Sequence, residues 1–98
     1  MANAKQELME AVRDKQVELV RIVFKPDLYE PGKVIEGTLD SVLPQLDFKY
    51  DEGFGGQELF GYIWYTDGTW SERAEYDGSE WWMYKRPPPK DINIETEL

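Results

Sequence analysis

Carboxylates are the reactive side chains that this sequence offers in number, since its 98 residues include 20 aspartates and glutamates but no histidine and no cysteine. The commonest nucleophiles, general bases and ligands of soft metal ions are therefore missing. Five carboxylates lie on or beside one aromatic stretch, where a pair could in principle cleave a glycoside: Asp67, Glu72, Glu75, Asp77 and Glu80. A chain this short is too small to build a deep cleft around a sugar, and turns explain both aspartates. We therefore predict that the protein is not an enzyme.

The acidic, glycine-rich segment 51–58, DEGFGGQE, does not have the pattern of a metal or phosphate site. No Asp-x-Asp-x-Asp-Gly order supplies the ligands of a calcium loop. The segment lacks the Gly-Lys-Ser/Thr of a nucleotide-binding loop, and its carboxylates would repel phosphate. We predict no cofactor and no metal. The segment is interpreted as a connecting loop, or alternatively as a tip that presents Phe54 to a partner.

The carboxylates listed above belong to a stretch, residues 59–86, that also contains all four tryptophans. Two Asp-Gly pairs, Asp67-Gly68 and Asp77-Gly78, interrupt runs of residues that favour strands. An Asp-Gly pair in this setting is the strongest short-range signal of a β-hairpin, because both residues tolerate positive φ. The stretch is therefore predicted to be a three-stranded meander.

The loop length at each turn decides the strand register, and two registers are open. Two-residue loops would give the cross-strand pairs Tyr65–Trp70 and Arg73–Trp82. Three-residue loops with a glycine bulge would give the pairs Trp64–Trp70 and Trp70–Tyr84. We favour the bulged register at both turns, because the other register sets Glu75 opposite Glu80 and so creates a like-charge contact.

The bulged register predicts which aromatic residues share a face. One face would hold Phe60, Tyr62, Trp64, Trp70, Ala74, Trp82 and Tyr84. The other would hold Leu59, Ile63, Trp81 and Met83. Both sets are too apolar to be freely solvated, so each face should be covered at least in part by the chain itself or by a partner.

The rest of the chain predicts a helix and a hairpin. Residues 4–15 have helical spacing, with Asn3 as N-cap and an apolar stripe of Leu8, Met9 and Val12. Residues 17–25 are β-branched and fit a strand or more helix, and Pro26 ends either one. Further strands are predicted at residues 33–42, where Gly37 marks a bulge or a close approach by the helix, and as a short edge strand around residues 46–50.

These elements predict an α+β fold, in which a short N-terminal helix packs on an antiparallel sheet of about five strands, a hairpin plus the meander. Residues 1–98 form a single domain in this interpretation. Residues 1–16 are the helical region, residues 17–86 the sheet, and residues 87–98 an acidic tail that begins with three prolines and is thereby stiffened.

Net charge indicates what kind of partner the protein would attract. The chain carries −9 overall, and residues 26–98 carry six basic against sixteen acidic side chains. Such a surface repels nucleic acids and acidic membranes and favours a basic protein surface. The alternative is that the charge only keeps an aromatic-rich domain soluble. The polar start and the lack of a transmembrane-length apolar run predict a cytoplasmic protein.

Aromatic residues in excess of what a small core needs are the candidate binding residues, because Trp, Tyr and Arg most often anchor protein interfaces. We assign as anchors three residues on a possible edge strand, Trp81, Trp82 and Tyr84, and one at a loop tip, Phe54. The charged rim around them is assigned to Glu72, Glu75, Asp77 and Glu80. Arg73 among these rings is typical of a cation–π contact with a tryptophan. The alternative, stacking on single-stranded nucleic acid, lacks a basic groove.

The run DGTWSERAEYDGSEWW, residues 67–82, resembles a segment of small orphan proteins encoded by tailed bacteriophages and prophages. The resemblance implies a setting in the cytoplasm of a bacterial host. It also implies that the protein binds and blocks a host protein. The targets of such phage proteins include defence enzymes that handle nucleic acid, which the phage proteins occlude or to which they mimic DNA.

Three functions follow as hypotheses. The first is a non-enzymatic, acidic binding protein that inhibits its partner, with aromatic anchors and electrostatic steering. The second is a small assembly protein that forms homo-oligomers through its sheet edge. The third is a carbohydrate-binding module that uses coplanar tryptophans.

Overall fold

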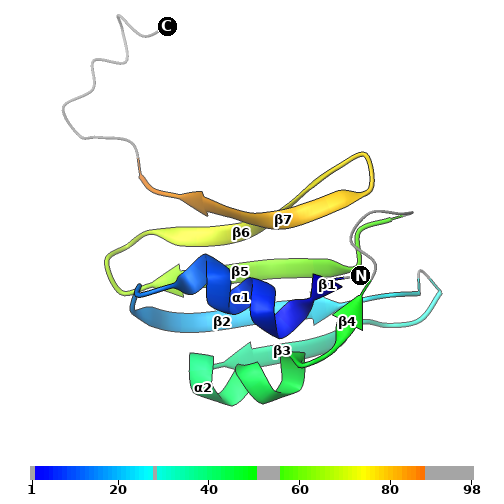
Figure 1. Ribbon diagram of the computed structural model, residues 1–98, viewed down its shortest axis with the longest axis horizontal. Helices are drawn as coiled ribbons and strands as arrows, with labels where there is room; N and C mark the ends of the chain where they lie inside the picture. Colours follow the sequence, from blue (N-terminus) through cyan, green and yellow to red (C-terminus); the bar gives the residue numbers. More distant parts are fainter. Residues whose placement is uncertain (1, 28, 51–55, 88–98) are drawn as a thin grey trace, which may run out of the picture.

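The protein has an α+β fold built on one antiparallel sheet (Figure 1). The structure is a computed structural model and describes residues 2–27, 29–50 and 56–87. The five-stranded sheet has the order β3-β2-β5-β6-β7. Its strands are β2 (Val17–Phe24), β3 (Lys33–Gly37), β5 (Leu59–Tyr65), β6 (Trp70–Tyr76) and β7 (Ser79–Lys85). The predicted fold class, with a hairpin beside a three-stranded meander, is confirmed.

A small two-stranded ribbon joins the start of the chain to its middle. It pairs β1 (Ala2–Asn3) with β4 (Lys49–Tyr50) in antiparallel fashion. The predicted strand near residues 46–50 is therefore present in part, but it pairs with the N-terminal segment and does not extend the main sheet. The ribbon carries Tyr50 into the core, where its side chain is buried.

Helix α1 (Ala4–Val12) follows β1 directly and packs on the sheet. Asn3 caps it as predicted, because its side-chain oxygen accepts a hydrogen bond from the Gln6 amide at 3.0 Å. The predicted apolar stripe was wrong at one position: Met9 is 52 % exposed, and Ala4 is buried beside Leu8 and Val12. A residue four positions before Leu8 lies under it on the same helix face, whereas position 9 is turned away from the core.

The strand predicted over residues 33–42 ends at Gly37, and a helical segment replaces its second half. Thr38 caps α2 (Leu39–Val42) by accepting a hydrogen bond from the Ser41 amide at 3.3 Å. The short 3-10 helix η1 (Leu43–Leu46) continues from it. Gly37 has a φ of 148°, and a Cβ there would lie 2.6 Å from the Ser41 hydroxyl oxygen. The close approach of a helix to Gly37 is thus real, but the helix is α2.

The two Asp-Gly turns have different lengths, so one predicted register is confirmed and the other was wrong. Trp64 pairs with Trp70 across a three-residue loop, as predicted. At the second turn Asp77 and Gly78 both have positive φ, 53° and 86°, which is the signature of a two-residue type I′ turn. Strand β7 is shifted accordingly, and the cross-strand pairs are Arg73–Trp82, Glu75–Glu80 and Trp70–Lys85.

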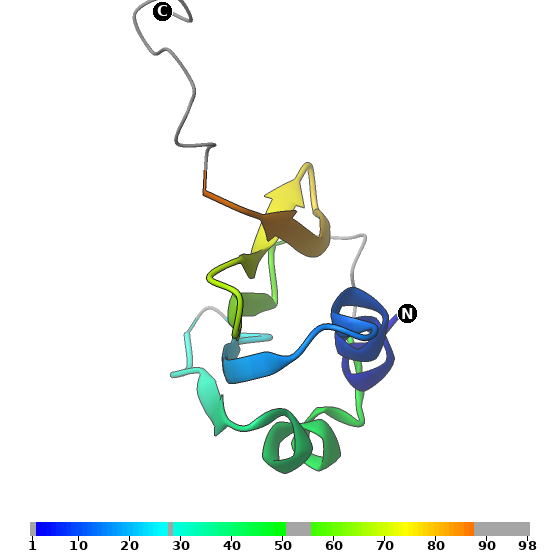
Figure 2. The same cartoon turned by 90° about the vertical axis from the view of Figure 1, so that its left-hand side faces the viewer.

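One face of the sheet, here called the inner face, forms the core with both helices and η1. The buried apolar residues of this core are Ala4, Leu8, Val12, Val20, Ile22, Ile35, Val42, Leu46, Tyr50, Leu59, Ile63 and Tyr65. The helices lie to one side of the strands (Figure 2). Side chains at alternate strand positions point to the opposite side, here called the outer face.

Candidate protein-binding surface

The outer face is where the sheet exposes large apolar side chains. Because of the shift at the second turn, Trp81 and Met83 join the aromatic residues of β5 and β6 on this face, and Trp82 and Tyr84 move to the inner face. The exposed large apolar residues of the outer face are Val34, Phe60, Tyr62, Tyr76, Trp81 and Met83, with 53, 40, 45, 76, 38 and 37 % of their surface accessible. Trp64 and Trp70 lie between them and are half-buried.

The rings of the outer face support one another. Tyr62 and Trp64 stack with their centroids 5.4 Å apart and their planes at 22°. Trp64 faces Trp70 directly across the β5–β6 ladder. Neighbouring aromatic rings on adjacent strands hold each other in place and add to the stability of the sheet. The outer face therefore presents rings that are already ordered, which lowers the entropy cost of binding.

Charged residues are interspersed with the rings. Trp70 Nε1 donates a hydrogen bond to Glu72 Oε1 at 3.2 Å, and Lys85 Nζ lies 3.1 Å from the same oxygen. These two donors, the indole first, lower the pKa of Glu72. On the other side, Arg21 and Glu36 form an ion pair at 3.7 Å, with both side chains about half exposed. In the ladder Arg21 and Glu72 are the direct cross-strand neighbours of Tyr62, so the charges alternate with the rings across the face and do not form a border around it.

Arg73 and Glu80, which lie on the inner face, form a buried ion pair. Their side chains are 1 and 0 % exposed. Glu80 Oε1 accepts from Arg73 Nη2 at 2.9 Å and from Nε at 3.1 Å. The same carboxylate accepts the backbone amides of Glu58 and Leu59 at 2.8 and 3.1 Å. The predicted role of Glu80 as a rim charge does not fit this position, because its carboxylate is in the interior.

The ion pair is part of a chain of polar groups that joins α1, β4, β6 and β7. Arg73 Nη2 donates to the Tyr50 hydroxyl, which donates to Glu7 Oε1. Burial, and then the hydrogen bond to Glu7, raise the pKa of Tyr50 well above its usual range. The Arg73 guanidinium also lies over the ring of Trp82, 5.1 Å from its centroid, which is the cation–π contact predicted from the sequence. Among the described residues, the buried Arg73 Nη1 has no hydrogen-bond partner, so this group of polar side chains is not fully satisfied.

The residues predicted as binding residues are divided among several places. Trp81 and Glu72 lie on the outer face. Glu75 and Asp77 are exposed at the β6–β7 turn. Phe54 lies outside the described residues. The outer-face residues Phe60 and Tyr62 were not chosen from the sequence, although their alternation with Leu59, Gly61 and Ile63 places them on one face with Trp64.

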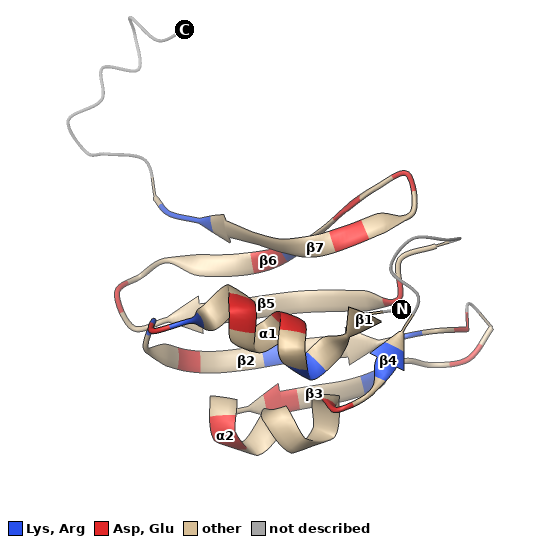
Figure 3. Cartoon of the chain, in the orientation of Figure 1, with Lys and Arg blue, Asp and Glu red and all other residues tan. Residues whose placement is uncertain are grey.

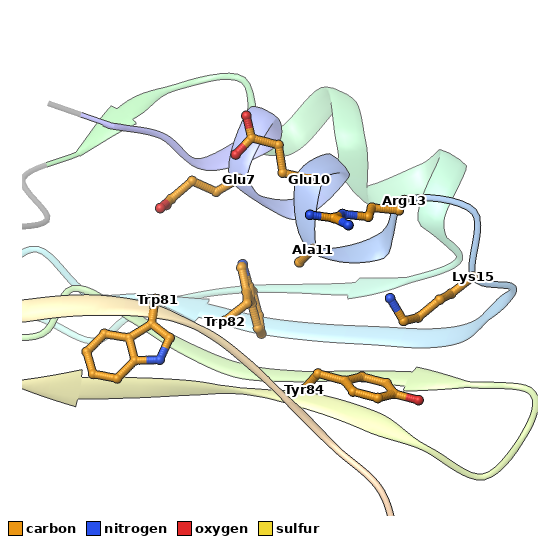
Figure 4. Close-up of a pocket in the computed structure, with 8 residues that line it drawn as sticks. All are labelled: Glu7, Glu10, Ala11, Arg13, Lys15, Trp81, Trp82 and Tyr84. Carbon is orange, nitrogen blue, oxygen red and sulfur yellow. The ribbon is translucent and has the colours of Figure 1, made fainter.

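A groove of about 400 Å³ lies between α1 and strand β7 (Figure 4). Its walls carry both charge signs and aromatic rings, and include Glu7, Glu10, Arg13, Trp81, Trp82 and Tyr84. Trp82 points from β7 toward the helix. Lys15 lies 4.9 Å from the centroid of the Tyr84 ring, a second cation–π contact. The predicted anchors Trp82 and Tyr84 are therefore beside this groove and not on the outer face.

Other kinds of site find no support in the part of the chain that the structure describes. Within those residues no group of three or more aspartates or glutamates is placed to hold a metal ion. No helix among them is both long enough and apolar enough to cross a membrane. Comparisons with protein-family models, with curated proteins and with solved structures gave no significant match.

Proposed function

We propose that this chain is a non-enzymatic binding protein that attaches to a basic surface of another protein through its outer face. The observation that carries the proposal is the set of exposed rings on the sheet face opposite the helices, above all Phe60, Tyr62 and Trp81. Aromatic anchors dominate the binding energy of many interfaces. The net charge of −9 would speed association with a basic partner and slow it with an acidic one.

The more specific form of the proposal is that binding blocks the partner. A host enzyme that handles nucleic acid would present the basic surface that an acidic protein recognises. This form rests on the charge and on the resemblance of residues 67–82 to phage proteins. It predicts that the partner's nucleic acid competes with this protein for the same surface.

The test compares two tyrosines that differ in position but not in chemistry. Tyr62→Ser removes a ring from the outer face, whereas Tyr29→Ser removes a ring that is 95 % exposed in the β2–β3 connection, outside the strands. Tagged wild type and both variants are used to capture proteins from a bacterial lysate, and the captured protein is then purified. We expect Tyr62→Ser, and equally Trp81→Ala, to weaken binding about 30-fold, the effect of losing roughly 2 kcal/mol at an interface anchor.

Tyr29→Ser should bind the purified partner like wild type. Circular dichroism of each variant shows that its fold is intact. Binding that is equal for wild type, Tyr62→Ser and Trp81→Ala would refute the outer face as the site. An association rate that does not fall as salt is raised would refute electrostatic steering.

A further inference from the structure

Strand β7 forms an edge of the sheet that none of the other described residues pairs with. It is seven residues long and contains no proline. The opposite edge, β3, has five residues and passes directly into Thr38 and α2. Proteins protect long edges because unpaired backbone groups there pair readily with another strand. Strand β7 is therefore the edge that is open to a further strand.

The type I′ turn determines which backbone groups of β7 face outward. In a two-residue hairpin the residues that flank the turn, here Tyr76 and Ser79, exchange both backbone hydrogen bonds. Hydrogen-bonded and non-hydrogen-bonded pairs then alternate along the ladder. The amide and carbonyl groups of Glu80, Trp82 and Tyr84 consequently point away from β6, toward the open edge.

The edge is complementary to itself in charge. Acidic residues lie at the turn that precedes β7, and basic residues lie where the strand ends (Figure 3). Asp77 is at the first end, and Lys85 and Arg86 are at the second. An antiparallel arrangement of two such strands places the basic end of one against the acidic end of the other, and opposite charges across a ladder are favourable.

We propose that two copies of this chain pair through β7 in antiparallel fashion, which makes one continuous ten-stranded sheet. The two-fold axis passes at Trp82, the middle residue of the strand, so that Trp82 faces its own copy and Glu80 faces Tyr84. This register is the one that uses the outward-facing groups of all three residues. It also sets Trp81 of one chain opposite Met83 of the other on the outer face.

A groove lies next to the proposed interface. Its volume is about 400 Å³, and it is lined by residues of α1 and of the edge strand β7 (Figure 4). In the proposed register the inner-face side chains of the second copy's β7 lie on the same side of the sheet as the groove of the first copy. Glu7 and Glu10 of the first copy line that groove. The proposal is independent of the function proposed above, because it requires no other protein and is tested with the purified chain alone.

The first test measures the oligomeric state by sedimentation across a concentration series at about 0.15 M salt, where the Debye length of about 8 Å limits repulsion between two acidic copies. Tyr84→Pro and Tyr84→Ala both lose the ring, but only the proline also loses the outward-facing amide, and proline is tolerated at an edge. We expect wild type and Tyr84→Ala to dimerise and Tyr84→Pro to dimerise at least tenfold more weakly. Two results would overturn the proposal. One is wild type that stays monomeric at about 0.5 mM, roughly the upper limit of such a series, and the other is equal dimerisation of the two Tyr84 variants.

The second test reads the register with single cysteines, which the natural chain lacks. Directly opposite residues have Cα atoms about 4.5–5.5 Å apart, within disulfide range, whereas diagonal neighbours at about 7–8 Å are beyond it. A mixture of Trp81→Cys and Met83→Cys chains should therefore form a disulfide-linked dimer under mild oxidation. Tyr29→Cys mixed with Met83→Cys is the control for random collision. A disulfide in Trp81→Cys alone, or equal linkage in the control, would overturn the pairing stated here.

Discussion

Replacing Glu80 by glutamine is expected to cost the protein a large part of its stability. The buried Arg73 guanidinium would keep its charge and lose the carboxylate that compensates it, since both side chains are within the core. Removing one partner of a buried pair costs about 3–5 kcal/mol, against a total of roughly 5–15 kcal/mol for a domain. The variant also loses one of the two oxygens that accept the amides of Glu58 and Leu59.

The matched control is Glu75→Gln on the neighbouring strand. Glu75 lies directly opposite Glu80 but is exposed, so the same chemical change there should alter the free energy of unfolding by less than about 0.5 kcal/mol. The assay is urea unfolding followed by tryptophan fluorescence. With m near 1–3 kcal/mol per M, the midpoint of Glu80→Gln should fall by at least about 1 M.

Two outcomes would refute this reasoning. The first is a free energy of unfolding for Glu80→Gln within about 1 kcal/mol of wild type at an unchanged m, which would mean that the pair is solvated or rearranges easily. The second concerns the double variant Arg73→Met/Glu80→Met. Because this variant removes both charges, its loss in free energy of unfolding should be smaller than the summed losses of Arg73→Met and Glu80→Met. Strict additivity of those losses would mean that the two side chains do not interact.

Two further predictions concern single positions in the core and the sheet. Gly61→Ala should destabilise the fold by more than about 2 kcal/mol in the urea assay, because φ is +145° and a Cβ would lie 2.1 Å from the Arg21 carbonyl oxygen. The control is Gly56→Ala, which has open space around it and should leave the free energy of unfolding unchanged. Equal effects of the two substitutions would contradict the close contact at Gly61. Above pH ~10 the free energy of unfolding of wild type should fall by about 1.4 kcal/mol per pH unit relative to that of Tyr50→Phe. The reason is that Tyr50 ionises in the unfolded chain at this pH, whereas its raised pKa keeps it protonated in the folded protein. A stability difference between the two proteins that is constant from pH 8 to 11 would contradict the buried hydroxyl.

The local part of the fold could be predicted from the sequence. The Asp-Gly pairs marked both hairpins, and Asn3 and the apolar spacing marked α1. The α2 segment was missed because residues 38–42 also alternate like a strand. Thr38 is a residue type favoured at a helix N-cap, but a helix of four residues is too short for a periodic pattern to reveal.

The second register was missed for a physical reason. The prediction avoided Glu75 opposite Glu80 on the assumption that both carboxylates would be exposed and repel. In the structure Glu80 is neutralised by Arg73 and by two backbone amides, so the contact costs little. Arg73 and Glu80 are diagonal neighbours in the two-residue register, and this pairing of opposite charges was a signal available in the sequence.

The polar chain around Arg73 could not be predicted, because it joins side chains from positions 7, 50, 73 and 80. No local pattern relates such distant positions, and only the packing of α1 and β4 over the meander brings them together. The placement of the candidate binding residues failed with the register, since a slip of one residue exchanges the two faces of β7.

The four indoles all belong to β5, β6 and β7, and this has a consequence for how the protein can be observed. Intrinsic fluorescence reports on the meander, while the β2–β3 hairpin and both helices are silent in that channel. Far-UV circular dichroism reports on the helices and on all the strands, including β2 and β3. If the two signals coincide during denaturation, the meander and the rest of the fold unfold as one unit. If the fluorescence transition comes later, the meander remains folded after the helices have unfolded.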